Sequence, residues 1–386
     1  MSSKTKWGAW SVAFVWFTTH FGGGFASGRQ LVDFYVQYGW YAVFMPFVSV
    51  GVIALVLYCA WGFSVKHRLY DYRSWSVQYF KPLGWLEPVF SAIIEVMYLI
   101  ILLLATGVAF ATGGTILSQQ FPGLSYHVGT VGLAVLIFVL TIWGAETVRK
   151  AATVMAILII GGMLVIYSSN LVVNFPALLQ VLRETPSANG GFWPALWQSI
   201  KYGGLQCSLV GAYIAVADGL HDRVDVKKAT FVGFLINAGV LALASIGALI
   251  HYPAILAEKA PIMYITQHGG GGNVGVALVS VIILLAVVST GVGLIYGGAR
   301  RISTWWMKRT GTTQSRKVDV LSSGIYVTIS WCVASFELIP LISKGYAWVG
   351  VMSTPLVVIP IVLIAVFCRA RPEQAASAAP QPLPEA

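Results

Sequence analysis

A run of glycines interrupts the first long apolar segment of this chain. Apolar residues run from Trp7 to Phe17 and resume at Leu31, and the segment 18–29 between them reads TTHFGGGFASGR. Each glycine costs about 1 kcal/mol in a helix relative to alanine. Lipid offers no partner for the backbone groups that a broken helix exposes, so a break at this depth has to line a cavity or be buried in protein. The tract therefore predicts a discontinuous membrane helix with a binding site at its break.

The composition is that of a membrane protein. The 386 residues are 57% hydrophobic and 10% charged, whereas a soluble domain carries about 25% charge. The mean hydropathy is +0.78. These values predict an all-α polytopic membrane protein. The formal net charge is +10, but most of the 24 Lys and Arg lie in alternate connections between apolar segments. The excess therefore indicates topology rather than nucleic-acid binding.

Ten apolar segments are long enough to cross a membrane. We expect helices near 8–36, 40–63, 87–119, 126–144, 150–170, 193–218, 228–251, 273–303, 321–340 and 345–368. The basic residues predict that both termini are cytoplasmic, because connections on the opposite side hold only Arg183, Lys259 and Lys344. The expected location is the bacterial cytoplasmic membrane. Residues 1–371 are expected to form the membrane domain, and the Ala/Pro-rich tail 372–386 is predicted to be disordered.

The second half of the chain repeats the pattern of the first. The sixth helix carries the polar, glycine-containing stretch Lys201–Gln206 in its interior, as the first helix carries its glycine tract. The third helix of each half, at 87–119 and 273–303, is unusually long. Because each half has five helices, an odd number, the second half (193–368) enters the membrane from the side opposite to the first (8–170). The predicted repeat is therefore inverted.

With this layout the chain resembles the amino acid–polyamine–organocation superfamily, whose LeuT-type fold is a five-plus-five inverted repeat with broken helices 1 and 6. Within it, the stretch Gly-Gly-Gly-Phe-Ala-Ser-Gly followed by two polar residues, at 22–30, is most similar to the YkvI-like bacterial membrane proteins. The resemblance implies secondary active transport by alternating access. It also implies that helices 1, 2, 6 and 7 rock against helices 3, 4, 8 and 9.

The break in helix 1 has two chemically different sides. The first half of the helix is expected to end near Phe21 and to leave the carbonyl groups of residues 18–21 free. The second half is expected to start within residues 24–26, with free amides that suit an anion such as a carboxylate. The alternative is close helix packing through the small residues Gly24 and Gly28.

Helix 6 places Lys201 near mid-membrane, where a charge costs at least about 2.5–3.5 kcal/mol. We therefore expect a partner, and Glu95 on helix 3 is the leading candidate. The pair would contact substrate or titrate with protons. The alternatives are a structural ion pair or side chains that reach the membrane surface. Tyr98 is expected on the wall of the same cavity.

The resemblance further implies a sodium site. In sodium-coupled LeuT-type transporters a small residue of helix 8 supplies a carbonyl, and two hydroxyls follow three and four positions later. Ala286, Ser289 and Thr290 match that spacing, and helix 1 carbonyls at Thr18 and Phe21 would complete the set. Considered alone, Ser and Thr in a membrane helix usually bond to their own helix backbone.

Two further features lie close to the break. Arg29 and Asp33 are four residues apart and share a helix face. They are expected either to pair with each other or to form a gate at the outer mouth. His20 stands at the break and is expected to line the cavity. A metal-binding role is disfavoured, because no second His or Cys accompanies it.

The sequence thus predicts a secondary active transporter of a small polar organic solute, an amino acid or related compound, coupled to Na⁺. The alternatives are proton coupling through Glu95 and Lys201, or a channel or ligand sensor on the same fold. No catalytic constellation is present, so an enzyme is not expected. The expected partners are the solute and membrane lipid, without nucleic acid or an obligate protein partner. The residues expected to bind substrate are His20, Gly22, Gly23, Gly24, Phe25, Ala26, Ser27, Glu95, Tyr98, Lys201, Tyr202, Gly203, Gly204 and Gln206, and those expected to hold sodium are Thr18, Phe21, Ala286, Ser289 and Thr290.

Overall fold

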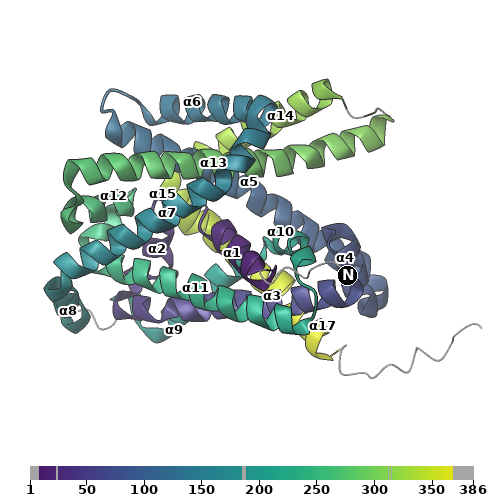
Figure 1. Ribbon diagram of the computed structural model, residues 1–386, viewed down its shortest axis with the longest axis horizontal. Coiled ribbons are helices and arrows are strands. Elements are labelled where there is room, and N and C mark those ends of the chain that lie inside the picture. The colour runs from purple at the N-terminus through teal and green to yellow at the C-terminus, as the bar shows by residue number, and fades with distance from the viewer. Residues whose placement is uncertain (1–7, 23–24, 185–187, 312, 314, 368–386) are drawn as a thin grey trace, which may run out of the picture.

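The structure, a computed structural model, describes the chain except residues 1–7, 23–24, 185–187, 312, 314 and 368–386, and except the side chains of 144–153, 156 and 188. The described residues form helices joined by turns (Figure 1). The predicted disordered tail lies outside the described residues. The helices up to residue 184 are α1 (Gly8–His20), α2 (Arg29–Phe34), α3 (Met45–His67), α4 (Tyr72–Phe80), α5 (Glu87–Gln120), α6 (Tyr126–Val139), α7 (Ala145–Val173) and α8 (Phe175–Glu184). The later helices are α9 (Phe192–Cys207), α10 (Val210–Ala215), α11 (Arg223–Leu249), α12 (Pro261–Thr266), α13 (Gly272–Thr310), α14 (Arg316–Ala334), α15 (Leu338–Pro340), α16 (Ala347–Ser353) and α17 (Ile359–Phe367).

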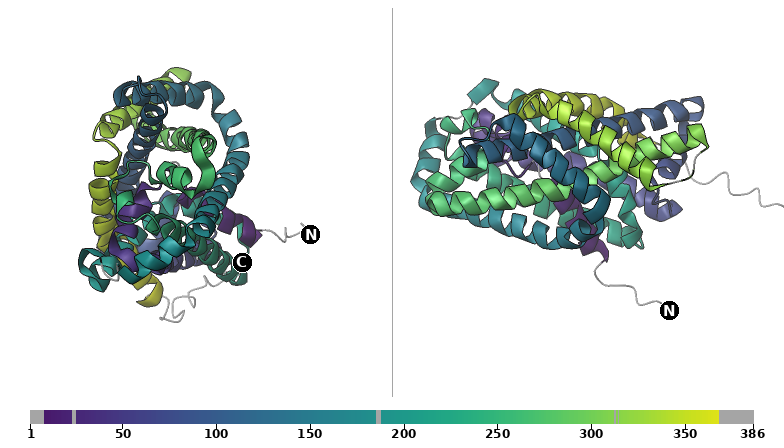
Figure 2. Two further views of the ribbon diagram at one scale, coloured as in Figure 1. Left: turned by 90° about the vertical axis from the view of Figure 1, so that its left-hand side faces the viewer. Right: turned by 90° about the horizontal axis from the view of Figure 1, so that it is seen from above.

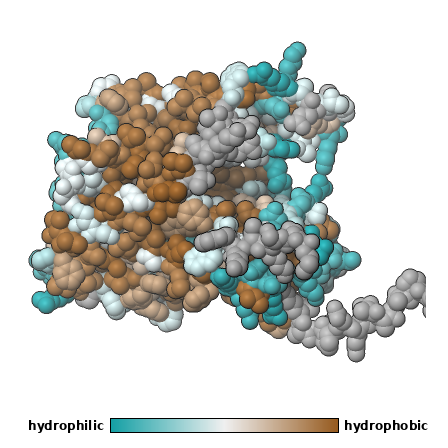
Figure 3. All heavy atoms as spheres, in the orientation of Figure 1, coloured by the Kyte–Doolittle hydropathy of each residue, from teal (hydrophilic) through white to brown (hydrophobic). Residues whose placement is uncertain are grey.

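The helices make this chain a multi-pass membrane protein. Within the described ranges, six helical stretches are long and apolar enough to cross a membrane. A seventh is added if α7 and α8, which meet at a bend of 78°, count as one span. Figure 3 shows a broad hydrophobic belt between two ends that carry hydrophilic side chains. We call these ends, after the helices found there, the α4 end and the α8 end. The described residues are helical within all ten expected segments, but the count of ten spans stays a prediction.

The predicted break in helix 1 is present. Helix α1 ends at His20, one residue before the expected end. The second half starts later than expected, at Arg29, after Gly28 with a φ of +78°, a left-handed conformation that favours glycine. The amide of Ile262 donates to the carbonyl of Ser27 at 3.2 Å, so the broken segment is held against α12. Helix 1 therefore consists of two short helices, and the described residues between them, 21–22 and 25–28, are not helical.

Helix 6 is also broken, but not at the predicted place. Residues 201–206 lie inside the continuous helix α9, and the interruption falls at Ser208 and Leu209, before α10. The hydroxyl oxygens of Ser208 and Ser353 lie 2.5 Å apart, so the break is bonded to α16. The expectation of a break within Lys201–Gln206 is therefore wrong in position, although an interruption follows two residues later.

The long helices α5 and α13 match the expected segments 87–119 and 273–303, and α13 extends further. They pack along each other and, with α6, α7 and α14, form one layer of the molecule. Helices α1, α3, α9 and α11 pack together as the other layer. Figure 1 shows α6, α13 and α14 along one side and α3, α9 and α11 along the opposite side, and the right-hand view of Figure 2 shows α13, in green, lengthwise.

Candidate functional site

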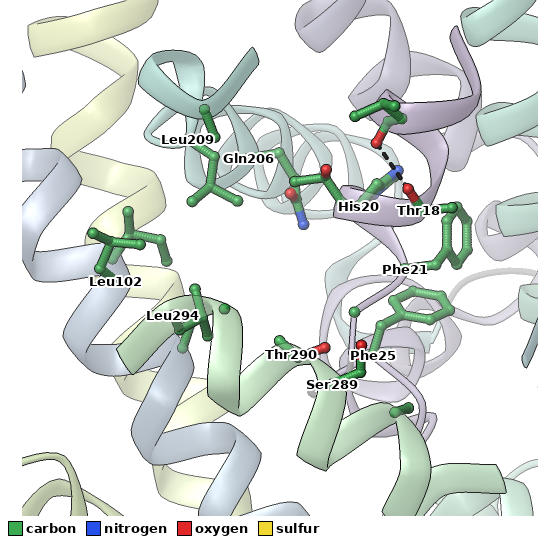
Figure 4. Close-up of a pocket in the computed structure, with 18 of the residues that line it drawn as sticks. Thr18, His20, Phe21, Phe25, Leu102, Gln206, Leu209, Ser289, Thr290 and Leu294 are labelled. Carbon is green, nitrogen blue, oxygen red and sulfur yellow. Dashed lines mark hydrogen bonds between the residues drawn. The ribbon is translucent and has the colours of Figure 1, made fainter. Parts of the chain in front are cut away.

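A cavity of about 500 Å³ lies beside the break of helix 1, between the two layers (Figure 4). Its volume is within the range of small-molecule sites, about 300–1,000 Å³. Residues of α1, α2, α5, α7, α9, α10 and α13 line it. From the break it extends toward the α4 end, where Phe14 and Val15 of α1, Tyr98 of α5 and Gly297 of α13 form the wall.

The residues predicted to hold sodium all line this one cavity. They are Thr18, Phe21, Ala286, Ser289 and Thr290. Among the described residues, no amide beyond the end of α1 donates to the carbonyl oxygen of Thr18 or Phe21. Figure 4 shows the hydroxyl groups of Ser289 and Thr290 directed from α13 toward the broken segment. Free carbonyl oxygens at a helix break are the groups that coordinate sodium in discontinuous membrane helices.

A glycine allows α13 to approach the break this closely. A Cβ atom added at Gly22 would lie 3.3 Å from the Oγ1 atom of Thr290. That distance is tighter than ordinary van der Waals contact, so with a larger residue at this position the Thr290 side chain would have to shift by a few tenths of an ångström. Gly22 therefore allows close contact between the carbonyl side of the break and the Thr290 side chain of α13.

Five of the residues predicted to bind substrate line the cavity: His20, Gly22, Phe25, Tyr98 and Gln206. Three others, Ala26, Ser27 and Tyr202, are buried nearby but do not line it. Gly23 and Gly24 lie outside the described residues.

Two of the amides that were expected to be free on the far side of the break are bonded within the protein. The amides of Phe25 and Ala26 both donate to the carbonyl of Gly22, at 2.9 and 3.3 Å. These two groups therefore already have acceptors in the protein. The expectation that they are free for a carboxylate is wrong for Phe25 and Ala26.

A directed chain of hydrogen bonds fixes His20. The side-chain nitrogen of Asn237 donates to the carbonyl of Gly233 at 2.7 Å, so its oxygen accepts from Nδ1 of His20 at 2.8 Å. Nε2 of His20 then accepts from the hydroxyl of Tyr202 at 2.9 Å, and Gln206 donates to that hydroxyl at 3.4 Å. The hydrogen-bond network therefore assigns His20 as the tautomer that carries its proton on Nδ1. Both ring nitrogens of His20 are therefore occupied by the protein, although the ring borders the cavity.

The predicted pairing of Glu95 with Lys201 is wrong. Glu95 of α5 forms a salt bridge of 2.5 Å with Arg301 of α13, and the Arg301 guanidinium lies 5.8 and 5.7 Å from the ring centres of Tyr72 and Tyr98. In the part of the chain that the structure describes, Lys201 has no carboxylate partner. Neither Glu95 nor Lys201 lines the cavity. The long helices α5 and α13 lie side by side, and this contact places Glu95 next to Arg301 rather than next to Lys201.

The two glycines of α9 are tightly packed against neighbouring helices. A Cβ atom at Gly203 would lie 2.8 Å from Cβ of Val52, and one at Gly204 would lie 2.6 Å from Oγ1 of Thr354. Neither glycine lines the cavity. They allow α9 to approach α3 on one side and the segment after α16 on the other. The contribution of Gly203 and Gly204 to substrate binding stays a prediction.

The predicted pair of Arg29 and Asp33 is present and buried. Nη2 and Nε of Arg29 donate to the two carboxylate oxygens of Asp33 at 2.6 and 3.0 Å. Nη1 also donates to the carbonyls of Leu256 and Glu258, at 2.9 and 2.8 Å. The exposed fractions of the two charged side chains are 7% and 9%. The pair joins α2 to the loop before α12, on the side of the break that faces the α8 end.

Two further residues of the cavity wall, Gln30 and Tyr346, were not predicted from the sequence. Gln30 is 4% exposed, and its side-chain oxygen has no hydrogen-bond partner among the described residues. The same holds for the side-chain oxygen of Gln206, which is 6% exposed. A further residue that was missed, Asn237, stands alone as a polar side chain in the middle of an apolar segment, and that isolation was the available signal.

Comparison with known sequences identifies one relative of this chain. The sequence matches no protein-family model. It is 25% identical over 316 residues to the uncharacterized membrane protein YkvI of Bacillus subtilis (strain 168), a match that covers 78% of this chain and 83% of that protein.

Several solved structures share the fold of this chain at low sequence identity. The inward-facing conformation of Mhp1 has a TM-score of 0.64 at 13% identity and covers 94% of this chain and 77% of its own. A substrate-bound, outward-open Na⁺-coupled sialic acid symporter has a TM-score of 0.60 at 12% identity, with 94% and 79% covered. These similar proteins are transporters rather than enzymes. The chain is therefore a membrane protein with the LeuT-type fold of these transporters, similar in sequence to YkvI.

Proposed function

We propose that this protein is a sodium-coupled secondary transporter of a small polar organic solute, an amino acid or a related compound. One observation carries the proposal. Thr18, Phe21, Ala286, Ser289 and Thr290, which come from two helices far apart in the sequence, line the same cavity at the break of helix 1. Carbonyl and hydroxyl oxygens without formal charge suit a weakly held monovalent cation. The sodium coupling of a symporter with this fold supports the same reading.

The proposal includes ten spans in two inverted halves and a bacterial cytoplasmic membrane. Basic residues at the α4 end, among them Lys66, Arg68 and Arg73, favour a cytoplasmic position for that end and for both termini. The cavity then extends toward the cytoplasm, and Arg29 with Asp33 lies on the extracellular side of the site. This arrangement corresponds to a state open to the inside.

Sodium would act by joining the two layers. Its proposed ligands in α1 and α13 belong to different layers, so bound sodium would hold these two helices together at the break, where Gly22 and Thr290 are already close. Release of the ion would allow α1 to move away from α13 and the solute to leave toward the α4 end. Coupling through Glu95 and Lys201 is not part of the proposal, because Arg301 is the partner of Glu95.

The test is uptake of a mixture of neutral amino acids into proteoliposomes under an inward sodium gradient. The double variant Ser289→Ala, Thr290→Ala is expected to lose sodium stimulation. The matched control is Thr304→Ala on the same helix, because the Thr304 hydroxyl bonds to the carbonyl of Arg300 at 2.7 Å, outside the cavity. This control should keep the stimulation. Unchanged sodium stimulation in the double variant would overturn the proposal.

A further inference from the structure

Lys201 carries a charge inside the membrane domain, and the described part of the chain supplies no counter-charge for it. It lies in α9, nine residues after Phe192, which at about 1.5 Å per residue places it about 14 Å along the helix from the α8 end. Among the described residues, no carboxylate or hydrogen-bond acceptor pairs with its ammonium group. It does not line the cavity at the break. An unpaired charge at this depth is costly, so we expect a partner from outside the chain.

Lys201 shares a helix face with two exposed tryptophans. Trp193, Trp197 and Lys201 are spaced four residues apart, so their side chains lie one above another along α9. Trp193 is 75% exposed and Trp197 is 46% exposed, and Lys201 is partly exposed beside them. Figure 1 shows α9 at the lower edge of the molecule, away from α13. Exposed tryptophans on an outer helix of a membrane protein lie at the level of the lipid headgroups. This face of α9 therefore lies against the bilayer near one of its surfaces.

The packing of α9 leaves the Lys201 side chain no room toward the protein. A Cβ atom added at Gly350 would lie 2.1 Å from the carbonyl oxygen of Lys201, so α16 packs directly on the α9 backbone there. One turn earlier, Gln198 is 6% exposed and donates to the carbonyl of Asp33 at 2.9 Å. Side chains on a helix lean toward its N-terminus, which for α9 is the α8 end. The flexible lysine stem can therefore extend past Trp197 and bring its ammonium group to the headgroup layer.

We propose that Lys201, with Trp193 and Trp197, binds the phosphate group of an anionic phospholipid in the leaflet at the α8 end. The phosphate supplies the missing counter-charge, and the indole N–H groups can donate to the ester and phosphate oxygens at the same level. An anionic headgroup is favoured over a zwitterionic one, because the cationic group of a zwitterionic headgroup already neutralises its phosphate. The site is separate from the cavity, so it does not depend on the proposed transport function.

The test of the ligand class is the binding of single lipid molecules to the purified full-length protein in detergent, measured by native mass spectrometry. The probe is dioleoyl phosphatidylglycerol. Dioleoyl phosphatidylcholine has the same chains with a zwitterionic headgroup, oleate carries a carboxylate, and glycerol 3-phosphate lacks the chains. The first phosphatidylglycerol is expected to bind about fivefold more tightly than each of the other three compounds. Equal or tighter binding of phosphatidylcholine, oleate or glycerol 3-phosphate would overturn the proposal.

Variants of Lys201 locate the site. Lys201→Met should weaken the binding of phosphatidylglycerol about fivefold, to the level of phosphatidylcholine, and Lys201→Arg should retain it. Lys259→Met is the matched control, because Lys259 is an exposed lysine in the loop before α12 that pairs with Glu337 at 3.1 Å. It removes the same charge and should leave the binding unchanged. An equal loss in Lys201→Met and Lys259→Met, or no loss in Lys201→Met, would contradict a site at Lys201.

Stability separates a lipid partner from a partner within the protein. Lys201→Met removes an uncompensated charge, so in phosphatidylcholine nanodiscs its melting temperature should stay close to that of the wild type. In phosphatidylglycerol nanodiscs the wild type should melt at a higher temperature than the variant. A Lys201→Met protein that does not fold, or that loses the same stability in both lipids, would show that the partner of Lys201 lies within the protein.

Discussion

The Nε2 atom of His20 in α1 lies 2.9 Å from the hydroxyl oxygen of Tyr202 in α9, and this bond connects the two broken helices at the cavity wall. The opposite ring nitrogen bonds to Asn237 of α11 at 2.8 Å, so one imidazole holds three helices of the same layer together. His20 therefore determines how the first half of helix 1 is placed relative to the cavity.

The Tyr202 hydroxyl should be important for stability. In Tyr202→Phe the His20 nitrogen loses its buried donor and the Gln206 amide loses its acceptor, and each such loss costs about 1–3 kcal/mol. We expect a clear fall in the melting temperature of the purified protein. Tyr213→Phe is the control, because no described residue bonds the buried hydroxyl of Tyr213. Its removal should cost little. Equal losses in the two variants would contradict the account of the His20 network.

The buried pair of Arg29 and Asp33 should contribute far more than an exposed pair nearby. Asp33→Ala leaves the Arg29 charge buried without its partner, and such changes cost about 3–5 kcal/mol. The exposed pair of Lys259 and Glu337, 3.1 Å apart, serves as the control, since Glu337→Ala should cost about 1 kcal/mol or less. Hydrogen exchange in residues 254–258 should rise only in Asp33→Ala. Unchanged exchange there would show that the pair does not hold this loop.

Double-mutant cycles should identify Arg301 as the partner of Glu95. Combining Glu95→Gln with Arg301→Gln should give a coupling of up to about 1 kcal/mol, because the salt bridge is partly exposed. Combining Glu95→Gln with Lys201→Met should give additive losses within about 0.5 kcal/mol. The measurement is the melting temperature of the single and double variants. A larger coupling to Lys201 than to Arg301 would restore the pairing expected from the sequence.

An added methyl group should have opposite effects at Gly204 of α9, which is tightly packed, and at Gly239 of α11, which is not. A methyl group in Gly204→Ala would lie 2.7 Å from the carbonyl oxygen of Gly350, so this variant should be destabilised and poorly expressed. At Gly239 in α11 nothing lies within 4 Å of the added Cβ. Gly239→Ala should gain up to about 1 kcal/mol from helix propensity. A Gly204→Ala protein as stable as Gly239→Ala would contradict this packing.

Features that depend on the backbone within one segment could be predicted from the sequence. The glycine tract predicted the end of α1 to within one residue. The low helix propensity of glycine and the lack of hydrogen-bond partners in lipid both act on this segment alone. Features that depend on which helices are neighbours could not. The glycines at 203 and 204 indicated a break, but the close approach of α3 and Gly350 requires them instead.

In the candidate site, too, only the features that depend on a single segment could be predicted. The spacing of Ala286, Ser289 and Thr290 selected residues that line the cavity, because residues at i, i+3 and i+4 share a helix face. The partner of Glu95 and the exposure of Gln30 to the cavity depend on how α5, α13 and α2 are placed in space. A single sequence carries no signal for that placement.

Sodium binding is tested most directly by the melting temperature of the purified protein in NaCl compared with KCl at equal ionic strength. A ligand that binds only the folded state raises stability in proportion to the logarithm of its concentration above its dissociation constant. We expect a rise with sodium, none with potassium, and loss of the sodium effect in the Ser289→Ala, Thr290→Ala variant. Equal effects of the two salts, or a sodium effect that persists in the variant, would contradict a sodium site between α1 and α13.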